Sequence, residues 1–228
     1  MKINGLQKLT LLDFPGRVAC TVFLAGCNWR CPFCHNASLV LGGEGDVMDE
    51  EEFFTFLGGR RRILDGVAIT GGEPLLRPDI AEFAARIKDM GFAVKLDTNG
   101  TRPEALRRLT EDGLVDYVAM DIKNSPAKYA VTTGCADDIE PVRESVRILM
   151  SGNVEYEFRT TVTRELHEPE DMTEIGKWIE GAMRYYIQQF RDSGELIGSG
   201  FSSPTAEEMA ALADAVRPYV PSVMLRGV

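Results

Sequence analysis

Three cysteines on one short segment carry the clearest chemical signal in this sequence. Cys27, Cys31 and Cys34 follow the pattern Cys-x3-Cys-x2-Cys. Thiolates are soft, charged ligands, so three of them on one loop suit a soft metal ion or an iron–sulfur cluster. A cubane cluster has one more iron than this loop has cysteines, so one iron would stay open to a small molecule.

Two other uses of these cysteines stay open from the residues alone. A structural zinc site could take His35 as its fourth ligand, although zinc ligands usually come as two separated pairs. Disulfide bonding would leave one of the three cysteines over, and nothing in the sequence suggests export. The other two cysteines lie far apart, and we expect Cys20, inside a predicted strand, to be a small core residue. Cys135 is expected in a loop.

The composition is ordinary for a globular protein, and we expect residues 1–228 to form a single α/β domain. Hydrophobic residues make up 44% of the chain and charged residues 26%. The net charge of −10 argues against a nucleic-acid partner, which would need a basic face. No apolar run approaches the roughly 20 residues of a membrane helix, and no signal peptide is recognisable, so we expect a cytoplasmic protein without a membrane partner.

Strands and helices are predicted to alternate along the chain. The expected strands are residues 18–24, 66–70, 92–96, 115–120, 156–162, 184–188 and 223–225, and the expected helices are 49–57, 79–90, 103–111, 141–150, 169–179 and 205–216. This alternation predicts a parallel sheet with right-handed crossovers. The fold class is therefore α/β, as a partial barrel of (βα)6 type, and residues 6–16 are expected to cover one end of the sheet.

Polar segments follow the predicted strands, where the chemistry of parallel α/β folds is found. They are the cysteine loop, Gly71-Gly72-Glu73-Pro74, Asp97-Thr98-Asn99-Gly100, Asp121-Ile122-Lys123, Arg159 with its neighbouring threonines, and Gln188-Gln189. Each alone could be a turn, a helix cap or a solvated ion pair. Together they offer groups for an anion, a cation and hydroxyls beside an open iron. A ligand with an amino group, a carboxylate, a ribose and a base would satisfy them.

These motifs resemble those of the radical S-adenosylmethionine (SAM) superfamily. The cysteine spacing, with Phe33 before the last cysteine, is similar to the superfamily's cluster loop, and residues 71–74 match its glycine-glycine-glutamate-proline motif. Residues 97–100 and 121–123 further resemble the glycyl-radical-enzyme activases, above all the activating proteins of anaerobic ribonucleoside-triphosphate reductase. The resemblance covers nearly the whole chain. It supports the cluster over zinc.

The resemblance implies a radical SAM fold, a cofactor set and a role for each matching residue. Cys27, Cys31 and Cys34 would hold a [4Fe–4S] cluster whose electron cleaves SAM into methionine and a 5′-deoxyadenosyl radical. Contacts to SAM would come from Gly71, Gly72, Glu73 and Pro74 at the amino group, Lys123 at the carboxylate, Phe33 near the adenine, and Arg159 and Gln189 at the ribose or adenine. Asp97, Thr98 and Asp121 match positions around a monovalent cation.

The resemblance also implies partners. The substrate would be a glycine of a glycyl-radical enzyme, most specifically anaerobic ribonucleotide reductase, and a flavodoxin- or ferredoxin-type protein would supply the electron. An alternative within the superfamily is an enzyme acting on a small molecule, similar to 7-carboxy-7-deazaguanine synthase, although that family tends to carry a modified cysteine loop. The two remaining cysteines exclude the extra ferredoxin-like clusters of some activases. His167 is expected on the surface.

Overall fold

The computed structural model describes residues 1–42, 48–136, 138–192 and 194–227, and its centre is an eight-stranded sheet. The strand order is β10-β9-β8-β7-β6-β5-β3-β2. Seven strands run parallel: β3 (Ala19–Leu24), β5 (Gly66–Gly71), β6 (Ala93–Thr98), β7 (Tyr117–Asp121), β8 (Glu155–Val162), β9 (Tyr185–Gln189) and β10 (Val223–Arg226). The eighth, β2 (Gly5–Thr10), pairs antiparallel with β3. The predicted parallel sheet is confirmed.

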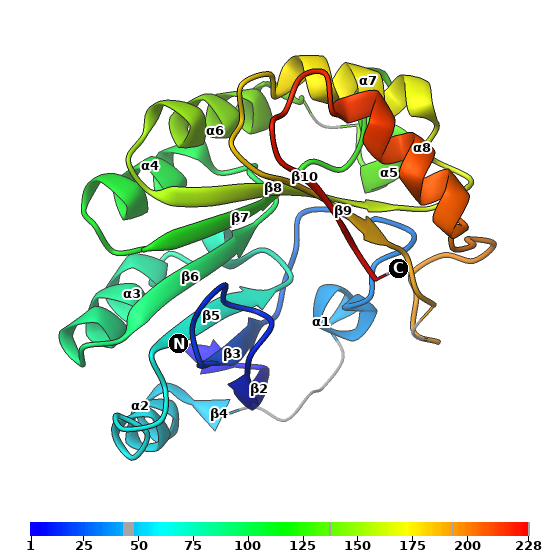
Figure 1. The fold of residues 1–228 in the computed structure, drawn as a ribbon. Helices are drawn as coiled ribbons and strands as arrows, with labels where there is room; N and C mark the ends of the chain where they lie inside the picture. The colour runs from blue at the N-terminus through cyan, green and yellow to red at the C-terminus, as the bar shows by residue number, and fades with distance from the viewer. Residues whose placement is uncertain (43–47, 137, 193, 228) are drawn as a thin grey trace.

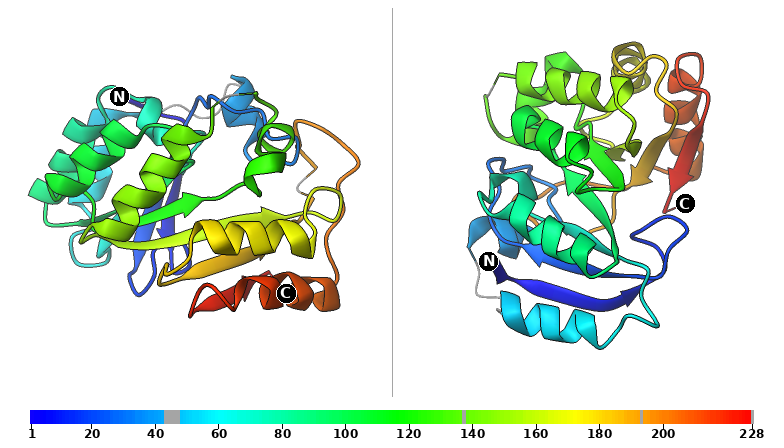
Figure 2. Two further views of the ribbon diagram at one scale, coloured as in Figure 1. Left: turned by 90° about the horizontal axis from the view of Figure 1, so that it is seen from above. Right: turned by 90° about the vertical axis from the view of Figure 1, so that its left-hand side faces the viewer.

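Helices follow the parallel strands and cover the outer, convex face of the curved sheet (Figures 1 and 2). They are α2 (Glu50–Gly58), α3 (Ile80–Asp89), α4 (Pro103–Glu111), α6 (Glu140–Ser151), α7 (Pro169–Trp178) and α8 (Ala206–Val216). Three of them, α2, α7 and α8, begin with a reciprocal capping box. In α8, the Glu208 amide donates to the Thr205 hydroxyl at 3.2 Å, as the sequence predicts. In α2, the same arrangement joins Asp49 and Glu52.

The first seventeen residues do more than cover one end of the sheet. Residues Gly5–Thr10 form the strand β2, which was not predicted from the sequence. Three of its six residues are exposed and its apolar residues do not alternate, so no strand pattern marks it. The segment after it does cover one end of the barrel. Phe14 is buried there, with its ring centroid 6.2 Å from that of Tyr117.

Short elements were also missed. β1 (Lys2–Ile3) pairs with β4 (Met48–Asp49), and α1 (Ala37–Leu41) and α5 (Tyr129–Thr133) flank the carboxyl ends of the strands (Figure 1). Isolated helices this short gain little from their own backbone hydrogen bonds, so no periodicity identifies them. Both pack beside the cysteine loop.

Alternate residues of each strand face different surroundings. On β6, Val94 and Leu96 lie in the large apolar core with the helices, whereas Lys95 and Asp97 line a cavity on the concave side. The amino end of this concave side is closed by a small apolar cluster of Phe14, Ala19, Ala93, Tyr117 and Ala119. Its carboxyl end is polar. The fold therefore separates an apolar outer layer from a polar inner layer on the same strands.

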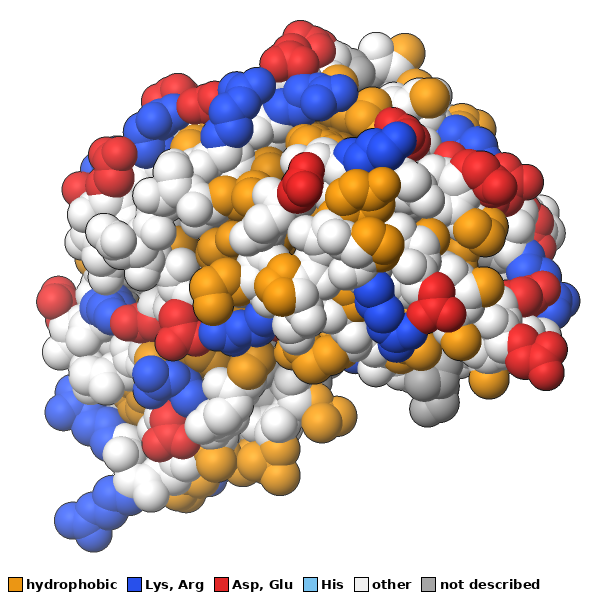
Figure 3. Space-filling view, turned by 45° about the horizontal axis from the view of Figure 1, so that its top comes forward, with side chains coloured by type: hydrophobic (Ala, Val, Ile, Leu, Met, Phe, Trp, Pro, Cys, Tyr) orange, Lys and Arg blue, Asp and Glu red, His pale blue; other side chains and the backbone are white. Residues whose placement is uncertain are grey.

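The outer surface carries mixed charge. Lys, Arg, Asp and Glu side chains alternate over the face in Figure 3, which therefore offers no broad basic surface to a phosphate backbone. Within the described ranges, no helix combines the length and apolarity that crossing a membrane requires.

Candidate active site

One pocket at the carboxyl ends of the strands collects most of the residues that the sequence singled out. Its empty volume is about 810 Å³, including space open to solvent. It is lined by Cys27, Trp29, Cys31, Phe33, Cys34, His35, Asn36, Val40, Thr70, Gly71, Gly72, Asp97, Thr98, Asn99, Asp121, Lys123, Arg159 and Thr161. Each predicted polar segment except Gln188-Gln189 therefore contributes to this pocket. Pockets of this size hold small molecules and cofactors.

The cysteine loop leaves β3 and is held on both sides by backbone contacts. The amide of Gly26 donates to the Leu39 carbonyl at 2.9 Å, and the amide of Arg30 donates to the Thr133 carbonyl at 2.9 Å. The ring of Trp29 packs edge-on against Tyr129 of α5, with centroids 5.6 Å apart. The short helices α1 and α5 therefore each fix one part of the loop.

The Gly71-Gly72 turn fits against the backbone of the cysteine loop. Gly71 has φ +121°, and a Cβ at Gly72 would overlap the carbonyl oxygen of Gly26. Side chains at either position would push the two loops apart. The amide of Glu73 donates to Gly26 O at 2.8 Å, and the Asn36 side-chain amide donates to Gly71 O at 2.8 Å. The glycines thus place the second loop directly beside the thiols.

Glu73 joins the second polar loop to the third. Its carboxylate is 1% exposed and accepts three hydrogen bonds, from the amide of Leu75 at 2.9 Å, the hydroxyl of Thr98 at 2.9 Å and the amide of Asn99 at 2.6 Å. Burial raises the pKa of Glu73 to about 7, although these three donors oppose the shift. Neither Glu73 nor Pro74 lines the pocket. The carboxylate therefore holds the two loops in position.

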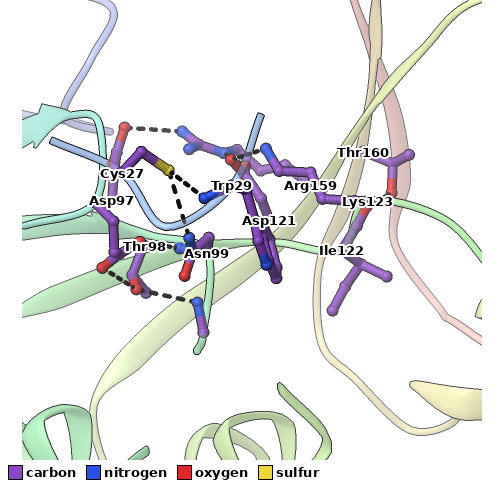
Figure 4. Close-up of polar contacts among 12 residues, drawn as sticks. Cys27, Trp29, Asp97, Thr98, Asn99, Asp121, Ile122, Lys123, Arg159 and Thr160 are labelled. Atoms are coloured by element: carbon purple, nitrogen blue, oxygen red, sulfur yellow. Dashed lines mark hydrogen bonds and ion pairs between the residues drawn. The ribbon is translucent and has the colours of Figure 1, made fainter. Parts of the chain in front are cut away.

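An alternating chain of charges crosses the pocket floor (Figure 4). Arg159 Nε donates to Asp121 Oδ1 at 2.7 Å, and Arg159 Nη1 donates to Asp97 Oδ2 at 3.0 Å. Lys95 pairs with the other oxygen of Asp97, and Lys123 Nζ donates to Asp121 Oδ2 at 2.8 Å. Asp97 also accepts from Thr70 at 3.2 Å. The order along this chain of charges is Lys95, Asp97, Arg159, Asp121, Lys123, and all of these except Lys95 line the pocket.

These pairings keep Asp97, Asp121, Lys123 and Arg159 ionised. Burial would raise the pKa of Asp97 and of Asp121, but Arg159 with the neighbouring lysines lowers both below the usual value. Burial would likewise lower the pKa of Lys123 and of Arg159, but the aspartates raise both above the usual value, and the Cys31 thiol adds to the shift of Lys123. Lys123 therefore stays a cation close to the cysteine loop.

The backbone of Lys123 is fixed by a buried histidine that the sequence reading placed wrongly on the surface. His167 is 4% exposed, although it lies in the loop that follows β8. Its Nδ1 accepts from the Thr163 amide at 3.1 Å, so its Nε2 carries the proton and donates to Lys123 O at 2.9 Å. The amide of Lys123 donates to Tyr129 Oη at 3.3 Å. Two buried rings thus orient the loop that presents the ammonium group.

Two further predictions concern residues around the adenine side. Phe33 lines the pocket, is buried, and meets Phe190, Phe201 and His167 edge-on at 6.0–6.4 Å. Gln189 does not line the pocket, since its side chain donates to Pro204 O at 2.7 Å. The predicted contact between Gln189 and the ribose or adenine therefore has no support in this arrangement.

Several pocket residues were missed, and Asn99 contacts the cysteine loop most closely. Its amide nitrogen lies 3.0 Å from Asn28 Oδ1 and 3.9 Å from Cys27 Sγ. Asn99 stands inside the segment 97–100, so the polar residues beside it were the signal that could have identified it as a site residue. Asn36, which follows the cysteines, was likewise noted only as part of the resemblance. Cys135 contacts the loop as well, with its Sγ 3.4 Å from Asn28 O, and Cys20 is fully buried in the apolar core as expected.

The three cysteines of the loop all border this pocket. Burial raises the pKa of Cys31 to about 12 and also raises that of Cys27, so these thiols must lose protons when they bind a metal. The Trp29 amide, 3.4 Å from Cys27 Sγ, is a donor suited to a ligating sulfur. The donor set fits a [4Fe–4S] cluster.

Known proteins share this sequence pattern. The model of the radical SAM superfamily matches residues 21–179. A Methanocaldococcus jannaschii protein described as a candidate glycyl-radical enzyme activating enzyme is 33% identical, over 98% of this chain and 95% of its own. The pyruvate formate-lyase-activating enzyme of Listeria monocytogenes is 30% identical, over 78% of this chain and 76% of its own.

The fold is shared as well. A domain of a pyruvate-formate lyase-activating enzyme from Bacteroides vulgatus superposes with a TM-score of 0.59 at 16% identity, covering 71% of this chain and 99% of the domain. The superfamily model covers more than half of the chain, and the Methanocaldococcus relative matches it almost end to end. The chain is therefore a member of the radical SAM superfamily.

Proposed function

We propose that this radical SAM enzyme activates a glycyl-radical enzyme by removing a hydrogen atom from one of its glycines. The superfamily's [4Fe–4S] cluster supplies one electron to SAM, which yields methionine and a 5′-deoxyadenosyl radical that takes the hydrogen atom. The observation that carries the proposal is the single pocket in which three thiols meet the Lys123 ammonium and the Gly71-Gly72 turn. The likeness to activating enzymes supports the choice of substrate.

Each wall of the pocket has a part in this proposal. The three thiols hold the cluster, and the Gly71-Gly72 backbone receives the amino group of SAM. Lys123 is a half-buried cation beside the thiols, and its charge suits the carboxylate of SAM. Phe33 offers an apolar ring edge to the adenine. Glu73 acts through the turn that it fixes, since its oxygens already accept three hydrogen bonds.

The open side of the barrel supports a protein substrate. β2 and β10 are the two ends of the sheet order, so the barrel is not closed by pairing between them. A second cavity lies between these ends, lined by Leu12 and Asp13 on one side and Arg226 on the other, and it reaches Asp97 and Arg159 of the pocket. A loop of a partner could enter here and reach the deoxyadenosyl radical. The partner would then shield the radical from solvent.

We propose anaerobic ribonucleoside-triphosphate reductase as the partner and a cytoplasmic flavodoxin or ferredoxin as the electron donor. The resemblance of residues 97–100 and 121–123 to the reductase activators supports this choice. A small-molecule reaction similar to that of 7-carboxy-7-deazaguanine synthase is the second candidate, because the pocket alone would also admit a compact substrate. The unmodified cysteine spacing favours the activase.

Activation of candidate partners tests the proposal. The reconstituted, reduced enzyme is incubated anaerobically with SAM and each glycyl-radical enzyme encoded in the same genome, and electron paramagnetic resonance is recorded. A glycyl doublet on the reductase alone is the expected result. A doublet on another enzyme would keep the activase function and change the partner. Turnover of a small molecule without any doublet would refute the proposal.

A further inference from the structure

The two aspartates expected around a monovalent cation already have protein cations on every carboxylate oxygen. Asp97 receives Lys95 on Oδ1 and Arg159 on Oδ2, and Asp121 receives Arg159 on Oδ1 and Lys123 on Oδ2. The hydroxyl of Thr98, the third expected ligand, donates to Glu73 at 2.9 Å and accepts from the Gly100 amide at 3.1 Å. The oxygen set that would bind Na⁺ or K⁺ is therefore engaged.

The local charge also disfavours an added cation. Lys95, Arg159 and Lys123 are cationic and Asp97 and Asp121 are anionic, so the chain of charges has one net positive charge. The side chains of Asp97 and Arg159 are each only 15% exposed, so solvent screens this charge weakly. A further cation would be repelled, whereas a carboxylate ligand would be attracted.

Arg159 is placed to bridge the aspartates by the strand register. It lies directly opposite Asp121 in the β7–β8 pair, and Asp97 stands on the next strand, β6. A guanidinium has donors in a fixed planar fork, so it can serve two carboxylates at once where a lysine serves one. Figure 4 shows the Arg159 side chain reaching toward both aspartates.

We propose that Arg159 replaces the monovalent cation in this enzyme: its guanidinium holds Asp97 and Asp121 in place and, with Lys123, leaves a positive pocket floor for the carboxylate of SAM. Arg159 is a positioning residue in this role. SAM binding then needs neither Na⁺ nor K⁺. The inference rests on SAM binding in this pocket, and it is independent of which partner carries the glycine.

The test compares SAM affinity in different salts. Cluster-loaded enzyme is titrated calorimetrically with SAM in sodium, potassium or tetramethylammonium chloride at equal ionic strength. The unmodified enzyme should bind with affinities that agree within about twofold in all three salts. Arg159→Ser should bind about tenfold or more weakly in tetramethylammonium, and Na⁺ or K⁺ should restore much of the loss, because two carboxylates then face each other without a bridge.

Two controls make the result specific. Arg184→Ser removes an arginine at the amino end of the barrel, where it pairs with Glu155, and should leave SAM affinity unchanged in every salt. Broadening of the ²³Na resonance gives a direct readout of bound sodium, which should appear with Arg159→Ser and be absent with the unmodified enzyme.

The inference is overturned if the unmodified enzyme loses about tenfold or more affinity in tetramethylammonium. It is also overturned if Arg159→Ser binds SAM as tightly as the unmodified enzyme in all salts, or more weakly with no response to cations. The salt series on the unmodified enzyme decides the matter even if the variant folds poorly. Salt-independent SAM binding without a glycyl doublet on any partner would refute the activase proposal and leave this inference standing.

Discussion

The two faces of the same strands are both buried, yet they are built from opposite chemistry. On β6, Val94 and Leu96 enter the apolar core beneath the helices, while Lys95 and Asp97 enter the ion-pair chain of the concave side. On β8, Phe158 is fully buried in the apolar core, and Arg159 joins the aspartates. The outer face is stabilised by removing apolar surface from water, and the inner face by mutual neutralisation of charges.

This difference separates stability from function. Removing an outer side chain leaves a cavity and destabilises the whole fold, but the pocket keeps its groups. Removing an inner side chain leaves a partner charge without its counter-ion beside the ligand site, so binding suffers first. Four substitutions test this separation, in order of decreasing effect.

Cys31→Ala should remove the cluster altogether, because the loop then has too few thiolates to hold it. Iron and sulfide content after anaerobic reconstitution should fall to background, and SAM cleavage with dithionite should cease. Cys20→Ala is the matched control, since Cys20 lies in the apolar core of β3. It should keep the cluster. Full iron content in Cys31→Ala would contradict the assignment of the ligands.

Leu96→Ala should lower the free energy of unfolding by about 2–5 kcal/mol, as deletion of a fully buried leucine generally does. Urea denaturation gives this value. The affinity for SAM should stay within about twofold of the unmodified enzyme under native conditions. A large loss of SAM affinity in a folded Leu96→Ala protein would show that the two faces are not separable.

Glu73→Gln should change how stability depends on pH. Burial raises the pKa of Glu73 from its ordinary value of 4.5 to about 7, so the folded state favours the protonated carboxyl. Its contribution to stability is present below pH 4.5 and is lost as the pH rises toward 7. Between pH 4.5 and 8 the unmodified protein should therefore lose about 2–4 kcal/mol more stability than Glu73→Gln.

Urea denaturation of the cluster-free proteins across this pH range measures the difference. Because glutamine brings a donor toward the Asn99 amide, the variant should also be the less stable protein at pH 4.5. Parallel stability curves for the two proteins would mean that the buried carboxyl does not titrate as its surroundings indicate.

Lys123→Ala should weaken SAM binding by about ten- to a hundredfold, or roughly 1.5–3 kcal/mol, with the cluster intact. Lys128→Ala is the matched control, because Lys128 pairs with Glu168 and Asp171 away from the pocket. Calorimetric titration of the cluster-loaded proteins gives both affinities. Equal SAM affinities of Lys123→Ala and the unmodified enzyme would show that the carboxylate of SAM does not bind on this side of the pocket.

Much of this architecture could be predicted from local sequence. The alternating strands and helices, the Thr205 capping box and the polar segments at the strand ends all depend on neighbours in the chain. The antiparallel strand β2 could not be predicted, because it is partly exposed and is ordered by pairing with β3.

The sequence predicted which residues form the site better than it predicted which groups those residues contact. Arg159 reaches Asp121 and Asp97, 38 and 62 positions away, and only the register of three strands brings them together. The same is true of His167, whose ring is buried because Lys123 O and the Thr163 amide meet on either side of it. Glu73 was predicted to contact the ligand, and its hydrogen bonds to the next loop could not be inferred from spacing.

The central claim is that the hydrogen atom removed by this enzyme comes from a glycine of a partner protein. The direct measurement uses anaerobic ribonucleotide reductase made with glycine that is deuterated at Cα, and mass spectrometry of the 5′-deoxyadenosine that forms with it. The account predicts one deuterium in 5′-deoxyadenosine, together with a glycyl doublet on the reductase. If 5′-deoxyadenosine forms without deuterium in the presence of the labelled reductase, and acquires it only from a deuterated small molecule, the claim is contradicted.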